Sequence, residues 1–151
     1  MRHLKRVTAF IVVLAISVAC MGTVYAANGS NEPQASPTLS MYAVWLDPGD
    51  NCGELDVSFE VVAAGWAESL GVSYIEIHKA SNDELVDTIY GSTSNGLKSS
   101  GFSYTNTYTY TGATHGVRYY AIVAIYAQIA TGVNTAIFDS RTLTTRTVTA
   151  P

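Results

Sequence analysis

The chain has 151 residues, of which 48% are apolar, and its formal net charge is −4 at pH 7. All twelve acidic residues lie after residue 26, and only five of the eight basic residues do. An acidic chain with scattered cations repels phosphate groups. We therefore expect neither nucleic acids nor anionic membrane surfaces as partners.

The first 26 residues have the organisation of a secretory signal peptide. A basic start with Arg2, Lys5 and Arg6 is followed by an apolar stretch over 9–21 and by Val24-Tyr25-Ala26. This pattern predicts export with cleavage after Ala26, and a secreted or extracellular location. The stretch ending at Cys20 also fits a lipoprotein site loosely, which would leave a lipidated Cys20 at the cell surface. No later segment is long and apolar enough to span a bilayer.

A polar tether is expected over 27–38, followed by one domain over 39–151, a length sufficient for a single core. After residue 26 the chain contains one cysteine, Cys52, so an internal disulfide is excluded. The apolar core must hold this domain together without a crosslink.

Alternation of apolar and polar residues predicts strands along most of the domain. Leu55, Val57, Phe59 and Val61 alternate with polar residues, which indicates a strand with one buried face. The segment 117–127 is apolar on both faces, so it is expected either to be central in its sheet or to contact a partner through one face. Turn residues divide the chain into seven expected strands, near 39–46, 55–64, 72–79, 84–91, 103–111, 117–127 and 136–148. The predicted class is all-β and antiparallel.

Two stretches carry a resemblance to a known fold. The run from Tyr104 to Tyr108, followed by the run from Gly116 to Val123, resembles strands E and F of fibronectin type III and other immunoglobulin-like domains. The segment 74–91 resembles their C–C′ hairpin. The resemblance implies a seven-stranded β-sandwich, in which the hydroxyl of Tyr119 bonds back across the corner before strand F. The chain departs from the pattern in two respects. No cysteine pair links strands B and F, and neither tryptophan lies on strand C. The whole chain is also similar to small secreted proteins of unknown function from Gram-positive bacteria.

The stretch DPGDNCGELD, residues 47–56, concentrates acids, glycines and Cys52. It lacks the ligand spacing of an EF-hand, so we expect a tight turn between the first two strands. Irregular calcium binding is the alternative, with the candidate ligands Asp47, Asp50, Glu54 and Asp56. An exposed Cys52 is expected to be a free thiol or to form an intermolecular disulfide in a homodimer.

No catalytic pattern is found. His78 and His115 lack partners at a diagnostic spacing, and GSTSNG at 91–96 lacks the G-x-S-x-G motif. We therefore expect neither an enzyme nor a cofactor, and rank a hydrolase below a binding protein. Alternating threonines over 105–111 also suggest an ice-binding surface, although a solvent-facing strand explains them without a ligand.

Aromatic residues supply the candidate contacts. Trp66 is expected in a loop over 65–71, where it either caps the core or contacts a ligand. Tyr120, Ile122 and Tyr126 occupy the second apolar face of the segment 117–127. With Trp66 they are the predicted binding residues of a non-enzymatic module for an extracellular protein or glycan. A self-associating structural protein of the cell surface is the alternative.

Overall fold

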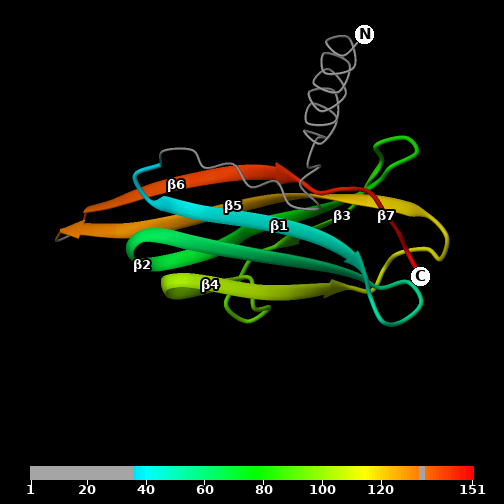
Figure 1. Cartoon of the computed structure of the whole chain (residues 1–151), viewed down its shortest axis with the longest axis horizontal. Helices are drawn as coiled ribbons and strands as arrows, with labels where there is room; N and C mark the ends of the chain where they lie inside the picture. Colours follow the sequence, from blue (N-terminus) through cyan, green and yellow to red (C-terminus); the bar gives the residue numbers. More distant parts are fainter. Residues whose placement is uncertain (1–35, 133–134) are drawn as a thin grey trace, which may run out of the picture.

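A computed structural model describes residues 36–132 and 135–151. These residues form strands and connections, with no helix among them: β1 Leu39–Pro48, β2 Leu55–Lys79, β3 Leu85–Tyr90, β4 Lys98–Tyr110, β5 Arg118–Gly132, β6 Thr135–Thr144 and β7 Val148–Thr149. Every pairing is antiparallel, which confirms the prediction of an all-β fold with seven antiparallel strands (Figure 1). The expected signal peptide, Cys20 and most of the tether lie outside the described residues.

The described ranges hold no helix of the length and apolarity that crossing a bilayer requires.

The longest strand, β2, corrects the prediction of a loop over 65–71. It runs for 25 residues through both segments that were expected to be separate strands. In Figure 1 it turns at the left end of the molecule and runs back. Register shifts place extra residues on β2 opposite β4 and β5, and Gly71 has a φ of +135°. Bulges and glycines let a strand bend sharply while it keeps its ladder, so the bend needs no loop.

The bend folds the sheet into two layers. The first half of β2, over 55–62, pairs with β1 on one side and β4 on the other. The second half, over 67–79, pairs with β5 on one side and with β3 and the start of β4 on the other. β6 extends this layer beyond β5, and β7 pairs with the start of β5. The last expected strand, 136–148, is thus two strands.

The core lies between the layers and follows the predicted alternation. Leu55, Val57, Phe59 and Val61 are fully buried, and they form one cluster with inward side chains of the other layer. β5 lies between β2 and β6, which confirms its predicted central position. Burial of apolar side chains, about 25 cal/mol per Å², is the main source of stability in a domain without a disulfide.

Candidate binding surface

An exposed aromatic pair lies at the bend of β2. Trp66 on β2 and Phe102 on β4 meet edge to face, with ring centroids 5.3 Å apart and an interplanar angle of 82°. Trp66 is 59% exposed and Phe102 is 60% exposed. Their neighbours Ala67 and Gly101 are paired and buried, so the two rings point away from the core. Trp66 therefore does not cap the core, and it lies on a strand rather than in a loop.

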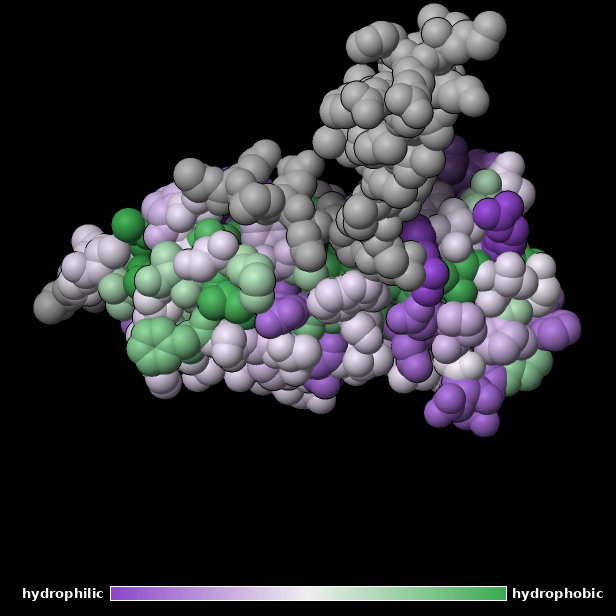
Figure 2. Space-filling view, viewed as in Figure 1, coloured by the Kyte–Doolittle hydropathy of each residue, from purple (hydrophilic) through white to green (hydrophobic). Residues whose placement is uncertain are grey.

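Most of the exposed large apolar side chains of the described residues lie at this end. Met41 pairs with Val62 next to the bend, and Ile137 pairs with Ile129, which itself pairs with Ala67. We name as the bend-end surface the residues Met41, Trp66, Phe102, Ile137 and Phe138. In Figure 2 apolar residues gather at the left end, where β2 bends, and most strongly hydrophilic residues lie toward the other end. A concentration of exposed apolar side chains marks a surface for interaction.

The predicted contact Tyr126 is buried rather than available to a ligand. It is 4% exposed, with Phe138 5.7 Å from its ring and the Lys98 ammonium 5.3 Å above it. Its hydroxyl also hydrogen-bonds to the hydroxyl of Ser69. Tyr126 therefore supports Phe138, and Phe138, at 58% exposure, is the aromatic side chain that solvent meets.

Tyr120 and Ile122 lie farther along the same outer face of β5. Tyr120 stacks on His78, with centroids 5.1 Å apart, and its hydroxyl donates a hydrogen bond to Asp83. Desolvation by burial, together with that bond, raises the pKa of Tyr120 above its ordinary value. Ile122 is partly exposed opposite Glu76. The structure thus places both residues near the end of the molecule opposite the bend, apart from Trp66.

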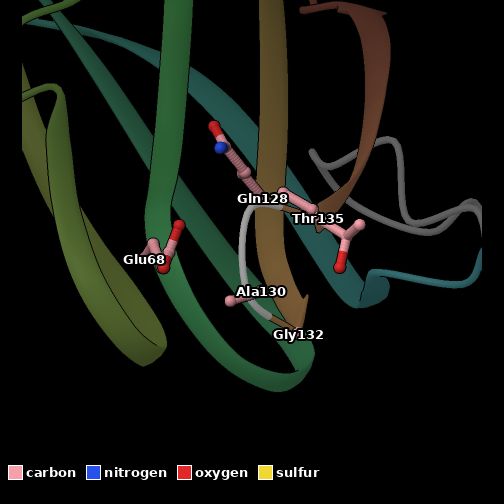
Figure 3. A pocket seen from close by; sticks show the side chains of 6 residues that line it. Glu68, Gln128, Ala130, Gly132 and Thr135 are labelled. Atoms are coloured by element: carbon pink, nitrogen blue, oxygen red, sulfur yellow. The ribbon is translucent and has the colours of Figure 1, made fainter.

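A shallow hollow lies beside the bend (Figure 3). Its described lining is Glu68, Gln128, Ala130, Gly132, Thr135 and Ala136. Glu68 falls at a bulge, where two residues of β2 oppose one of β5. A bulge redirects a side chain, and here the carboxylate and the amide of Gln128 are the polar groups that the two strands present. Glu68 is the one titratable group of this lining.

The stretch 47–56 forms the turn between β1 and β2. The amide N–H of Gly49 donates to the carbonyl oxygen of Glu54, and Gly53 has a φ of +80°. Three of the four calcium candidates have separate partners: Asp47 pairs with Arg146, Glu54 accepts from Asn51, and Asp56 accepts from Thr109. The described residues contain no group of three or more acids, histidines or cysteines placed to hold a metal ion.

Two further expectations concern single side chains. Cys52 is exposed and forms no disulfide within the described residues. His78 Nε2 lies 3.3 Å from a carboxylate oxygen of Glu76 and its Nδ1 lies 3.2 Å from the carbonyl oxygen of Asp83. These contacts, with the Tyr120 ring, cover most of the His78 side chain on the outer face of the sheet.

Phe102 and Phe138 were missed as candidate residues. Alternation from Leu143 places Phe138 on the outer face of its strand, which would have signalled its exposure. Alternation from Tyr104 would have placed Phe102 on the inner face, so the local pattern does not reveal its exposure.

Comparison of the chain with protein-family models, with curated protein sequences and with solved structures finds no match.

Proposed function

We propose that this chain is a secreted, non-enzymatic β-sandwich module that binds an extracellular protein or glycan through its bend-end surface. The observation that carries the proposal is the Trp66–Phe102 pair, two rings that a rigid sheet holds exposed. Exposed aromatic rings offer apolar area at little cost in side-chain entropy, because they have few rotatable bonds. Export is supported by the N-terminal sequence pattern.

The proposed fold is an immunoglobulin-like sandwich of the fibronectin type III kind. Three features support it. One layer contains β1, the first half of β2 and β4, which match strands A, B and E of that fold. The other contains β3, the second half of β2, β5 and β6, which match C′, C, F and G. Tyr119, at the start of β5, accepts a hydrogen bond from the backbone N–H of Thr114.

A binding role is favoured over catalysis by the composition of the candidate site. General acid–base or nucleophilic chemistry requires two or more reactive groups that converge. The hollow at the bend presents one carboxylate, that of Glu68, with an amide and small side chains. Such a set can orient a ligand by hydrogen bonds, and the exposed rings of the bend-end surface supply apolar area.

The test compares matched aromatic variants. Trp66→Ala and Phe102→Ala remove the exposed pair, and Tyr90→Ala removes an aromatic ring of 74% exposure on β3, away from the bend. The purified proteins are applied to a glycan array and sedimented with bacterial cell walls, insoluble chitin and cellulose. A protein ligand is sought by photo-crosslinking on cells, from a probe at position 66.

Loss of binding in the two bend variants, with retention in Tyr90→Ala, supports the proposal. Equal binding by all three proteins would refute the bend-end surface as the site. The melting temperature of each variant is measured in parallel, because loss of binding supports the proposal only in a variant that remains folded.

A further inference from the structure

The strand β6 forms an edge of its layer. Among the described residues it pairs with β5 on one side, through ten residue pairs. They run from Ile122 paired with Thr144 to Gly132 paired with Thr135. No strand among the described residues pairs with the other side of β6, where backbone N–H and C=O groups can pair with a further strand. Ile137 and Phe138 are exposed on this strand, at 41% and 58%. An edge with these properties is a template for strand addition.

The charges on this edge are arranged symmetrically. Asp139 and Arg141 flank Ser140 and point to the same face, since side chains alternate along a strand. Arg141 Nη1 donates to one carboxylate oxygen of Asp139, and the hydroxyl of Ser36 donates to the other. Arg141 Nε is buried without a hydrogen-bond partner among the described residues, so the guanidinium is not fully engaged.

We propose that β6 pairs with β6 of a second copy of this chain, antiparallel, about a two-fold axis at Ser140. In this register Asp139 lies opposite the partner's Arg141, and Arg141 lies opposite the partner's Asp139. The intrastrand and interstrand ion pairs then close a ring of alternating charge. A two-fold interface must be self-complementary, and the sequence Asp-Ser-Arg has this property.

The side chains beyond the charges fit the same register. Ile137 lies opposite the partner's Leu143, which joins two apolar residues. Phe138 lies opposite the partner's Thr142 on the outer face, an aromatic and β-branched pair of the kind that stabilises sheets. The pairing joins two four-stranded layers, β3–β2–β5–β6, into one continuous sheet.

Neighbouring registers are disfavoured by like charges. A symmetric slip of one step in one direction places Asp139 opposite the partner's Asp139. A slip in the other direction places Arg141 opposite the partner's Arg141. Like charges directly opposite each other destabilise a strand pair, so the charges select one register.

The test uses charge reversal in trans. Asp139→Arg and Arg141→Asp each place two like-charge pairs at the axis of a homodimer, and each should raise the dimer dissociation constant about tenfold or more. When the two variants are mixed, every pair across the axis is again opposite in charge, and a heterodimer should form with nearly the wild-type constant. The double variant Asp139→Arg/Arg141→Asp should also dimerise.

Sedimentation velocity over a concentration series measures these constants, on protein processed by a secreting host and kept reduced so that Cys52 cannot crosslink. Rescue in the mixture cannot come from the intrastrand ion pair, because each single variant lacks it. A wild-type chain that stays monomeric at about 1 mM overturns the proposal. So does a mixture that dimerises no better than its components.

A neutral variant separates the proposal from an edge that is protected against pairing. If the charges of Asp139 and Arg141 serve only to prevent strand pairing at this edge, the neutral variant Asp139→Asn/Arg141→Gln should self-associate more strongly than the wild type. The proposal requires weaker association, and stronger association would overturn it.

Discussion

The backbone N–H of Thr114 donates a hydrogen bond of 3.0 Å to the hydroxyl oxygen of Tyr119. Tyr119 is 1% exposed, and its ring belongs to the core cluster. One side chain thus fixes the connection that enters β5 and fills the space beneath it. Because β7 pairs with Arg118 and Tyr119, the same residue also positions the end of the chain.

Replacement of Tyr119 by Phe should therefore lower the free energy of unfolding by about 1 kcal/mol, because the ring is kept and one hydrogen bond is lost. Urea denaturation followed by tryptophan fluorescence measures the change. Tyr90→Phe is the control, since Tyr90 is exposed and should show a change within about 0.5 kcal/mol. Equal midpoints for Tyr119→Phe and the wild type would contradict the role given to this bond.

Gly91 is required by a close approach of two backbones. A Cβ at this position would lie 1.8 Å from the carbonyl oxygen of Val72, whereas a Cβ at Gly65 would lie 3.7 Å from Ile129. Gly91→Ala should destabilise the fold by about 3 kcal/mol, and Gly65→Ala by less than about 1 kcal/mol. Thermal unfolding by circular dichroism compares the two, and similar melting temperatures would show that the crossing at Gly91 has been placed wrongly.

Tyr126 should affect stability more than ligand binding. Tyr126→Ala removes a buried ring under Phe138 and should cost about 3–5 kcal/mol. Tyr126→Phe keeps the ring and loses the hydrogen bond to Ser69, which should cost about 1 kcal/mol. If Tyr126→Ala melts like the wild type, the ring cannot be buried as described.

Stability should fall at alkaline pH, in part through Tyr110. Burial raises the pKa of Tyr110 above its ordinary value of 10.0, with a further contribution from Asp87. The folded state therefore favours the neutral phenol, and this contribution is complete below the unfolded pKa and lost as pH rises through the folded pKa. Melting temperatures from about pH 8 to 11 should drop less steeply for Tyr110→Phe than for the wild type. Parallel curves would exclude Tyr110 as a source of the loss.

The sequence predicts the strands better than their connections. Alternation identifies the buried face over 55–61 because one side of that strand always meets the core. The sequence predicts a loop where β2 bends, because glycines bound the segment 65–71. Only pairing with β4 and β5, strands distant in sequence, keeps that segment in the sheet.

The candidate site shows the same division. Trp66 is identified from residue type, but the ring that packs against it, Phe102, comes 36 residues later along the chain. Tyr126 was expected at the surface, but the side chains that cover it, Phe138 and Lys98, come from strands whose register local patterns do not reveal. The calcium candidates lie close together in sequence, yet Asp47, Glu54 and Asp56 each have a different partner in the fold.

The path of β2 has a consequence for how the molecule can open. It pairs with four of the other six strands, and both layers share it as a member. Because both layers are built on β2, loss of this strand dismantles both, and its central paired amides are expected to exchange mainly through global unfolding. Hydrogen exchange should therefore be slowest along β2 on both sides of the bend, where it reports the global free energy of unfolding. In the monomer β6 and β7, each paired on one side among the described residues, should exchange through local fraying.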